Sequence, residues 1–159
     1  MNKLTIAHRS YIAGFLDGDG SIYVRLKPNV TYRFRYQVAP NIVFFQSKKE
    51  RSGLENIQQI LGIGYLRDRK DGIVEYTIGD EASIIALLTS IYPYLYLKRK
   101  QALIMLTILK KKKLVANGSD FLQLCALIDQ FQLLNYSKKR IQTSSAVQKT
   151  LIAEGILTP

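Results

Sequence analysis

The sequence predicts an α+β fold whose elements follow the order αββαββα and continue into a helical C-terminal part. Hydrophobic residues recur at helical spacing before residue 18 and alternate strictly after it, and a second helix with its own strand pair follows. The length of 159 residues and the hydrophobic content of 47% fit one domain with a sizeable core. We therefore predict a single domain over residues 1–159, with a core at about 5–135 and a basic loop and helix at 136–159.

The first part of the chain predicts one helix and two strands. A helix is expected at residues 5–18, where apolar positions are three and four apart, and a Gly-Asp-Gly-Ser cluster ends it. From Ser21 the side chains alternate between apolar and polar, which is typical of a strand with one buried face. A second alternating run is expected over residues 32–46. Pro40 in this run predicts an edge position or a bulge, because proline cannot donate a hydrogen bond to a sheet.

The rest of the chain predicts a second strand pair and five helices. Ser47 and Glu50 have the spacing of a capping box, so a helix is expected over residues 48–61. Asp80 is expected to cap the helix that follows the second strand pair. These later strands and helices are expected at residues 65–69, 73–78, 80–91, 97–113, 120–135 and 144–153.

The charge of the chain is strongly positive. It contains 23 Lys and Arg against 12 Asp and Glu, which gives a net charge of +11 and a pI of about 9.8. A surplus of this size on a small domain indicates a polyanionic partner. A basic ribosomal-type protein, or one that is merely soluble, is the alternative that composition leaves open.

Cysteine and histidine usage excludes several classes of site. One cysteine, Cys125, and one histidine, His8, allow neither a disulfide framework nor a closed zinc site within the chain. Cys125 is expected to be a buried small hydrophobe in a reducing compartment, and we assign His8 no role. No apolar run is long enough for a membrane span, and the N-terminus resembles neither a signal nor a transit peptide. We expect a soluble protein that acts where it is made.

Small residues on the first predicted helix indicate a close helix–helix contact. Gly14 and Gly18 stack on one face with Ala13 beside them, and a glycine inside a helix costs about 1 kcal/mol relative to alanine. Such a cost makes sense where another backbone packs on the glycines. The single copy of the pattern points to the same helix of a second subunit, although a plain glycine-rich turn is the alternative. The expected dimer interface comprises Tyr11, Ala13, Gly14, Asp17 and Gly18.

Asp19 is the candidate metal ligand. A carboxylate at a helix C-terminus loses about 0.3–1 kcal/mol against the helix dipole, and the last carbonyls, including that of Gly18, lack helical partners. Carboxylate and carbonyl oxygens are the ligands that Mg²⁺ and Ca²⁺ prefer. Asp17 points elsewhere and is expected to be structural. An EF-hand is excluded because the required glycine and glutamate positions hold Ile22 and Pro28.

The run YIAGFLDGDG at residues 11–20 resembles the signature of the LAGLIDADG homing endonucleases. The chain also resembles the single-motif, homodimeric enzymes encoded in algal chloroplast introns. Further matching positions cover nearly the whole chain and lie at residues 18–22, 27–28, 62–65, 67–69, 98, 100–102, 129–130, 134–135 and 137–138.

The resemblance implies a fold, a reaction and a location. It implies four antiparallel strands curved as a saddle over the DNA major groove, in a homodimer. It also implies Mg²⁺-dependent double-strand cleavage of a long, nearly palindromic site, which promotes intron homing. Mn²⁺ is expected to substitute for Mg²⁺, and Ca²⁺ to bind without turnover. The implied location is the chloroplast.

The resemblance also assigns roles within the catalytic pocket. The Asp19 carboxylate and the Gly18 carbonyl become metal ligands, while Gln46 and Lys98 organise water and stabilise charge on the scissile phosphate. One pocket position that is usually basic in the family falls on Glu50. The cation missing there is expected from Arg51, Lys49 or Lys48, and we prefer Arg51.

Alternation of side chains predicts a DNA-reading face. Arginine to guanine, glutamine to adenine and glutamate to cytosine are the usual major-groove pairings, and a two-stranded ribbon fits that groove. A solvated charged face is the alternative reading for any single arginine. A second basic segment at residues 138–142 matches a family loop that contacts the DNA backbone, whereas Lys110 to Lys113 are expected to form a solvated helix end. The expected DNA-contacting residues are Arg25, Lys27, Asn29, Val30, Thr31, Tyr32, Arg33, Arg35, Gln37, Val43, Gln46, Arg67, Arg69, Glu75, Thr77, Lys138, Lys139, Arg140 and Gln142.

Three functions fit this sequence, and the first is preferred. It is a homodimeric homing endonuclease that leaves 3′-hydroxyl and 5′-phosphate ends. The second is an RNA-splicing maturase on the same scaffold, and the third is a transcription regulator derived from the family without catalysis. The intact Asp19 and the basic strand face favour the nuclease.

Overall fold

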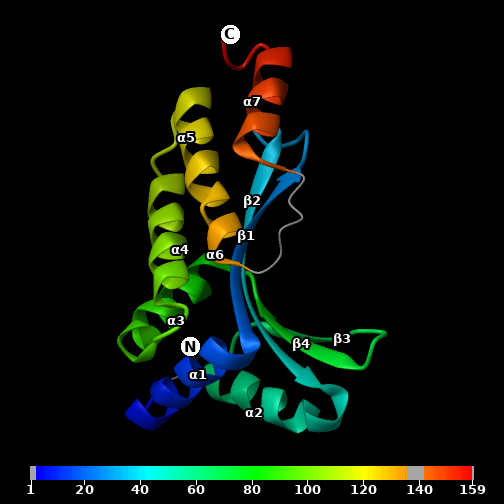
Figure 1. Ribbon diagram of the computed structural model, residues 1–159, viewed down its shortest axis with the longest axis vertical. Helices are drawn as coiled ribbons and strands as arrows, with labels where there is room; N and C mark the ends of the chain where they lie inside the picture. Colours follow the sequence, from blue (N-terminus) through cyan, green and yellow to red (C-terminus); the bar gives the residue numbers. More distant parts are fainter. Residues whose placement is uncertain (1–2, 136–141, 159) are drawn as a thin grey trace. The chain divides into compact units, whose positions relative to one another are not determined.

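The computed structural model describes residues 3–135 and 142–158 (Figure 1). Its element order confirms the predicted αββαββα order and the helical C-terminal part. The elements are α1 Ile6–Asp19, β1 Gly20–Pro28, β2 Tyr36–Ser47, η1 Lys48–Glu50, α2 Arg51–Leu61, β3 Tyr65–Asp68, β4 Ile73–Ile78, α3 Glu81–Ile91, η2 Tyr92–Tyr94, α4 Arg99–Lys112, α5 Gly118–Asp129, α6 Phe131–Leu134 and α7 Ser144–Ala153.

The chain divides into two compact units, each made of two stretches of sequence. Unit 1 comprises residues 1–22 and 40–103, and unit 2 comprises residues 23–39 and 104–159. The four strands form one sheet in the order β1-β2-β4-β3, and β4 pairs with both β2 and β3 in antiparallel register. The single domain expected over the whole chain stays a prediction. In the described part of the chain, no helix has the length and apolar character that a membrane span requires.

In unit 1, one face of the sheet packs against helices. The Phe44 ring of β2 stacks on Phe15 of α1 at 5.6 Å and on Tyr76 of β4 at 5.8 Å. The Tyr76 hydroxyl donates to the Ile63 carbonyl at 2.5 Å, which satisfies its one buried polar atom. Helix α2 lies along the β3–β4 pair and buries Leu54 and two further residues of its apolar face, Ile57 and Leu61 (Figure 1).

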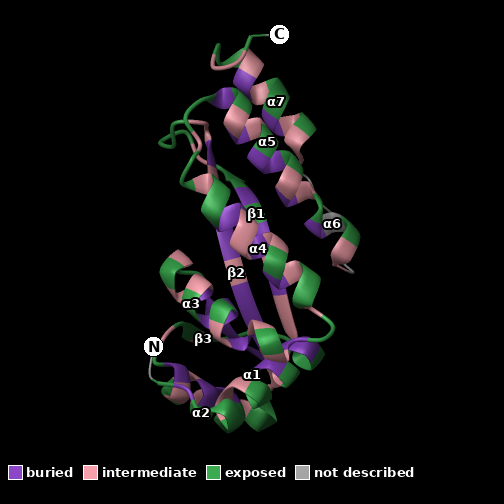
Figure 2. Ribbon diagram, turned by 90° about the vertical axis from the view of Figure 1, so that its left-hand side faces the viewer, coloured by how far each residue is buried: buried purple, intermediate pink, exposed green. Residues whose placement is uncertain are grey.

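In unit 2, the C-terminal helices form a core of their own. Helix α5 buries Phe121 and Cys125, and α7 packs against it through Val147 and Leu151. The burial of Cys125 confirms its expected role as a small hydrophobe. Figure 2 shows buried segments of α5 and α7 alternating with half-buried and exposed ones. One expected helix is interrupted, because α5 ends at Asp129 and α6 begins only at Phe131.

The helix starts differ in how well the sequence predicted them. Asp80 caps α3 as expected, since its Oδ2 accepts from the Ser83 N–H at 2.8 Å. The capping box at Ser47 is only half formed. The Ser47 hydroxyl accepts from the Lys49 N–H at 3.3 Å, but the Ser47 N–H donates to Gln46 Oε1 at 2.9 Å. Gln46 therefore performs the part expected of Glu50.

The second strand begins later than the alternation predicts. Residues 29–35 form a loop, and β2 starts at Tyr36. Phe34 stacks on Phe121 of α5 at 4.9 Å, so its apolar side chain serves contact with a helix rather than a sheet face. Arg35 has a φ of 62°, which lies in the left-handed region and cannot continue a strand.

The edge position expected for Pro40 is wrong, because β2 lies between β1 and β4 in the sheet. The pairing of β2 with β4 begins only at Ile42, opposite Ile78. Pro40 thus lies just outside this ladder, where no N–H is required of it on that side.

Candidate active site

The last turn of α1 presents the candidate metal ligands. Gly18 and Asp19 are exposed, and the helix closes with a hydrogen bond from the Gly20 N–H to the Leu16 carbonyl. A Cβ at Gly20 would lie 2.8 Å from the same carbonyl oxygen, so only glycine fits directly after Asp19. Within the described residues, no hydrogen bond reaches the Asp19 carboxylate. Its oxygens are available to an external ligand.

Asp17 serves its own chain. Only 8% of the residue is exposed, and its Oδ2 accepts from the N–H groups of Tyr96 at 2.7 Å and Leu97 at 3.2 Å. Its Oδ1 accepts from the Lys98 N–H at 2.9 Å. Asp17 therefore fastens the segment before α4 to the end of α1. Its carboxylate is a structural group rather than a candidate for contact with a second subunit.

Lys98 places a cation at the same helix end. Its Nζ donates to the Asp17 carbonyl at 2.5 Å. Partial burial lowers the pKa of Lys98, and the nearby charges of Asp17 and Asp19 act in the opposite direction. Lys98 and Asp19 therefore lie close enough for their charges to interact, and their common role in a catalytic pocket stays a prediction.

Gln46 and Val43 lie on opposite faces of β2. Gln46 is paired with Val74, and the alternation puts it on the face of Phe44, which packs against helices; Val43 is paired with Thr77 on the other face. The Gln46 side-chain carbonyl accepts a hydrogen bond from the Ser47 N–H. Its side-chain NH₂ group is the part of Gln46 that can donate to a ligand. Gln46 is thus separated from the base-reading face that the sequence assigned to it.

Arg51 is committed to two carboxylates. Its Nε donates to Glu55 Oε1 at 2.8 Å, and a terminal nitrogen contacts Asp68. The hydrogen bond to Glu55 is the largest of the effects that raise the pKa of Arg51. Lys48 shares Asp68 at 3.6 Å, whereas no ion pair of the described residues includes Lys49. These ion pairs argue against Arg51 as the pocket cation. Lys49 is the exposed cation that remains among the three candidates.

The ligands for a metal ion are incomplete in one chain. No cluster of three or more His, Cys, Asp or Glu residues occurs in the described stretches 3–135 and 142–158. The Asp19 carboxylate and the Gly18 carbonyl fit a hard cation. Mg²⁺ typically takes one or two carboxylates and completes its shell with water and substrate phosphate. The donor set therefore suits an ion that is shared with a phosphate group.

The glycine face of α1 is open. A Cβ added at Gly14 or Gly18 would meet no atom within 4 Å, and Tyr11 nearby is 60% exposed. Ala13 is fully buried in its own chain. Its side chain therefore belongs to the core, and the candidate contact face reduces to Tyr11, Gly14 and Gly18.

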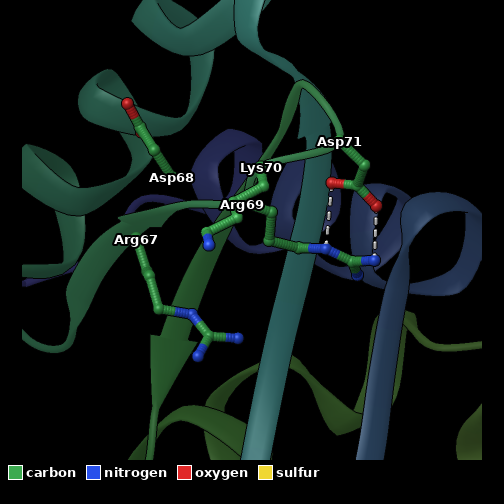
Figure 3. Close-up of a pocket in the computed structure, with 5 residues that line it drawn as sticks. All are labelled: Arg67, Asp68, Arg69, Lys70 and Asp71. Carbon is green, nitrogen blue, oxygen red and sulfur yellow. Dashed lines mark hydrogen bonds and ion pairs between the residues drawn. The ribbon is translucent and has the colours of Figure 1, made fainter.

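The β3–β4 hairpin holds its arginines in carboxylate pairs, and Figure 3 shows the pair of Arg69 and Asp71. The Arg69 guanidinium faces Asp71, with Nε to Oδ1 at 3.1 Å and a terminal nitrogen to Oδ2 at 2.5 Å. The Glu75 carboxylate forms ion pairs with Arg67 at 2.5 Å and with Arg69 at 3.2 Å. Burial opposes ionisation of Asp71, but the hydrogen bonds and charge of Arg69 outweigh it and lower the pKa of Asp71.

Glu75 and Thr77 are less accessible than the sequence suggested. Both residues are buried, at 8% and 7% exposure, so Glu75 acts as the partner of two arginines rather than as a free acceptor. Residues 65–78 contain three cations and three acids, so the hairpin carries no net charge. Its arginines are oriented groups rather than loose positive charges.

Unit 2 contributes exposed cations and a loop. Arg25 stacks on the Tyr23 ring at 4.8 Å, and Arg33 stacks on Phe34 at 5.0 Å. Lys27 is exposed at the end of β1, and Gln37 is half-buried on β2. In the loop, Asn29 Oδ1 accepts from both the N–H and the hydroxyl of Thr31, while Val30 and Tyr32 are exposed. Lys138, Lys139 and Arg140 lie outside the described residues, and Gln142 is half-buried beside them in sequence.

Comparison with known proteins decides the family. The model of the LAGLIDADG endonucleases matches residues 12–111, which include the last turn of α1 and Lys98. The chain belongs to the LAGLIDADG endonuclease family.

Its relatives in this family match over most of their length. The chain is 37% identical to DNA endonuclease I-CreI of Chlamydomonas reinhardtii over 89% of the chain and 86% of that protein. It is 35% identical to DNA endonuclease I-CvuI of Chlorella vulgaris over 89% and 88%. The crystal structure of I-CvuI with the I-CreI target and 2 mM Mg, in which the DNA is not cleaved, has a TM-score of 0.90 and 34% identity, with 96% and 97% coverage. These matches confirm the predicted LAGLIDADG fold and identify the chain as a DNA endonuclease.

In this LAGLIDADG chain, the sequence did not predict two carboxylates that hold arginines, Asp71 and Glu154. Asp71 is the main partner of Arg69, and the only sequence signal for it was a carboxylate two positions after an arginine in a turn. Glu154 pairs with Arg35 at 3.1 Å across 119 positions of sequence. No local pattern could have indicated that second pair.

Proposed function

We propose that this chain is a homing endonuclease that cuts both strands of a long, nearly palindromic DNA duplex as a homodimer. The observation that carries the proposal is the exposed Asp19 carboxylate, which accepts no hydrogen bond from the described residues and lies beside the Lys98 ammonium and the open glycine face. The helix dipole disfavours a carboxylate at a helix C-terminus, so an exposed carboxylate that accepts no hydrogen bond there is a natural ligand for an external cation.

Divalent metal ions support the cleavage in this proposal. Structures of I-CvuI with DNA have been obtained in the presence of 2 mM Mg and of 2 mM Ca. For this chain we expect Mg²⁺ to support cleavage, Mn²⁺ to substitute for it, and Ca²⁺ to permit binding without turnover. The chloroplast is the proposed location, because the two relatives come from the algae Chlamydomonas reinhardtii and Chlorella vulgaris.

The residues of the candidate pocket have distinct tasks in this reaction. Asp19 and the Gly18 carbonyl would hold the metal ion, which when bound lowers the pKa of a coordinated water and stabilises charge at phosphorus. The Lys98 ammonium stabilises the negative charge that develops on the scissile phosphate. The Gln46 NH₂ group orients the attacking water, and Lys49 takes the place of the basic residue that Glu50 replaces. In-line attack leaves 3′-hydroxyl and 5′-phosphate ends.

A homodimer provides one such site for each DNA strand. Gly14 and Gly18 leave room for a second helix backbone, and exposed apolar side chains accompany them. Tyr96 is 88% exposed and Leu97 is 75% exposed, and Asp17 holds both beside the end of α1 through their N–H groups. Exposed apolar groups around small residues support an isologous contact, which would bring two Asp19 carboxylates to one axis.

The Asp19→Asn variant tests the proposed function. We expect it to bind its duplex with unchanged affinity in Ca²⁺ and to lose cleavage in Mg²⁺ by at least about 10²–10³-fold, the scale of losing one group that stabilises transition-state charge. The target is first obtained by selecting cleaved sites from a randomised duplex library. Asp120→Asn, which removes the same charge from the start of α5, should cut normally. Undiminished cutting by Asp19→Asn would exclude its role as metal ligand.

An RNA-splicing maturase on the same scaffold is the second candidate. The exposed Asp19 favours the nuclease, because RNA binding alone gives no reason to keep a carboxylate at this helix end. A gel-shift competition between the selected duplex and the intron RNA separates the two. Preference for the RNA, with no cleaved duplex recovered from the library, would support the maturase.

A further inference from the structure

The loop between β1 and β2 is closed at its base and open at its tip. The Asn29 N–H donates to the Arg35 carbonyl at 2.7 Å, and the Arg35 N–H donates to the Tyr32 carbonyl at 2.8 Å. Between these bonds Val30 is 76% exposed and Tyr32 is 41% exposed. The tip is therefore presented to solvent on a backbone whose hydrogen bonds are already made.

Arg35 is the one non-glycine residue with positive φ among the described residues. Glycine adopts this left-handed conformation without steric cost, so an arginine here needs a compensating interaction. The side chain supplies two. A terminal nitrogen donates to the Val30 carbonyl at 2.8 Å, and Nε donates to Glu154 Oε2 at 3.1 Å. Arg35 thus ties the tip of the loop to the residue that follows α7.

The residues on either side of Arg35 contact two C-terminal helices, α5 and α7. Phe34 stacks on Phe121 of α5 at 4.9 Å, and the Tyr36 hydroxyl hydrogen-bonds to the Thr150 hydroxyl of α7 at 2.9 Å. Thr150 and Glu154 are four positions apart, so they lie one turn apart at the same end of α7. Three consecutive residues therefore anchor the loop beside α5 and α7 (Figure 1).

We propose that Arg35 and Glu154 are positioning residues, which hold the β1–β2 loop in the geometry that reads the outer base pairs of the DNA target. Helix α7 is the support that this geometry requires. A loop ordered before binding loses less conformational entropy on the DNA, so its contacts discriminate better between sequences. The proposal rests on the proposed function, since it concerns the same DNA. It also replaces the direct DNA contact that the sequence suggested for Arg35.

Variants of Glu154 distinguish the effect of its charge on DNA binding from its role in positioning the loop. Removing an acid from a DNA-binding protein normally strengthens DNA binding and has no reason to change sequence preference. If Glu154 positions the loop, Glu154→Ala should reduce the ratio of cleavage rates between the target and its outer-pair variants by about tenfold. The rate on the target at saturating DNA should stay unchanged. Glu154→Gln loses the same charge but keeps an acceptor for Arg35, and it should retain the discrimination.

Arg35→Gly provides the second test. Glycine suits the backbone conformation but makes neither side-chain bond, so this variant should fold and show the same loss of discrimination as Glu154→Ala. Equal melting temperatures of the variants and the parent chain would exclude general unfolding. Unchanged discrimination in both variants would overturn the proposal.

Amide hydrogen exchange tests the anchoring without DNA. The N–H groups of Asn29, Tyr32 and Arg35 should exchange at least about tenfold faster in Arg35→Gly and Glu154→Ala, and at the parent rate in Glu154→Gln. Unchanged exchange would overturn the proposal even if the chain cuts DNA. Faster exchange in a chain that neither binds nor cuts duplex DNA would instead count against the proposed function.

Discussion

Two carboxylates in the last turns of α1 have opposite surroundings. Asp17 is buried and accepts three backbone N–H groups, while Asp19 is exposed and receives no hydrogen bond from the described residues. Positions two apart on a helix differ by about 200° in direction, so one side chain faces the core when the other faces solvent. The interactions of Asp17 stabilise the fold. The Asp19 carboxylate is accessible to a ligand instead.

This contrast predicts different effects on stability. Asp17→Ala should lower the free energy of unfolding by roughly 2–4 kcal/mol, because it deprives three backbone donors of a charged acceptor. Asp19→Asn should leave it unchanged or raise it slightly, since a carboxylate at a helix C-terminus is disfavoured by about 0.3–1 kcal/mol. Urea denaturation of both variants measures the difference. Equal losses would show that Asp19 has a structural role that the hydrogen bonds do not reveal.

At the scale of elements, local signals predicted most boundaries. The strand at Ile73–Ile78 and the helix capped by Asp80 agree with the structure because turn residues and a cap determine them within a few positions. The sequence predicts a strand from residue 32, whereas residues 29–35 form a loop. The prediction is wrong there because Phe34 alternates like a strand residue but packs on a distant helix. For the candidate site, local patterns indicate the helix end and the family resemblance indicates Lys98, whereas the ion pairs of Arg35 and Arg51 depend on tertiary structure.

The open face of α1 gives a test of the dimer. Gly14→Ala should stabilise the isolated chain by about 0.5–1 kcal/mol, because alanine favours the helix and its Cβ meets no atom within 4 Å. The same methyl group should weaken self-association and cleavage if a second helix packs there. Sedimentation over a concentration series measures association. Gly53→Ala in α2, which has equal space, is the matched control and should leave association unchanged. Unaltered association in Gly14→Ala would place the interface elsewhere.

In the β3–β4 hairpin, we expect the Asp71 carboxylate to keep Arg69 from binding DNA phosphates. Asp71→Asn should weaken the hold on Arg69, which then reaches phosphates and steepens the salt dependence of binding to random duplex by up to about 0.9 per chain. Discrimination among single-base-pair variants of the target should fall. Asp120→Asn removes the same charge without releasing an arginine and serves as the control. An equal response of both variants would reduce the effect of Asp71 to its charge alone.

Positive charge is distributed unevenly over the whole molecule. The segments of unit 1, which contain Asp19 and Lys98, have 11 Lys and Arg against 9 Asp and Glu, a net charge of +2. The segments of unit 2 have 12 against 3, a net charge of +9. Unit 1 therefore supplies the proposed chemistry with little net field, and unit 2 supplies most of the general attraction to a polyanion.

This division predicts which cations set the salt dependence of DNA binding. Lys27 is exposed at the end of β1, where the fold requires no cation, so we expect it to contact phosphate. Lys111 lies in the last turn of α4, where the helix dipole already accounts for a lysine. A phosphate contact contributes about 0.9 to the slope of log K against log salt, and a homodimer contains two copies. Lys27→Ala should thus lower the slope by about 1.8, and Lys111→Ala should leave it unchanged.

Binding isotherms in Ca²⁺ at several salt concentrations measure both slopes. A decrease of about 0.9 for Lys27→Ala would indicate that only one copy contacts the DNA, which contradicts a symmetric dimer on a nearly palindromic site. An equal decrease for Lys111→Ala would show that the excess charge of unit 2 acts as a diffuse field. In that case the exposed cations near the β1–β2 loop would have no privileged position on the DNA. Only a decrease of about 1.8 for Lys27→Ala, with no change for Lys111→Ala, links the charge of unit 2 to the twofold symmetry proposed for α1.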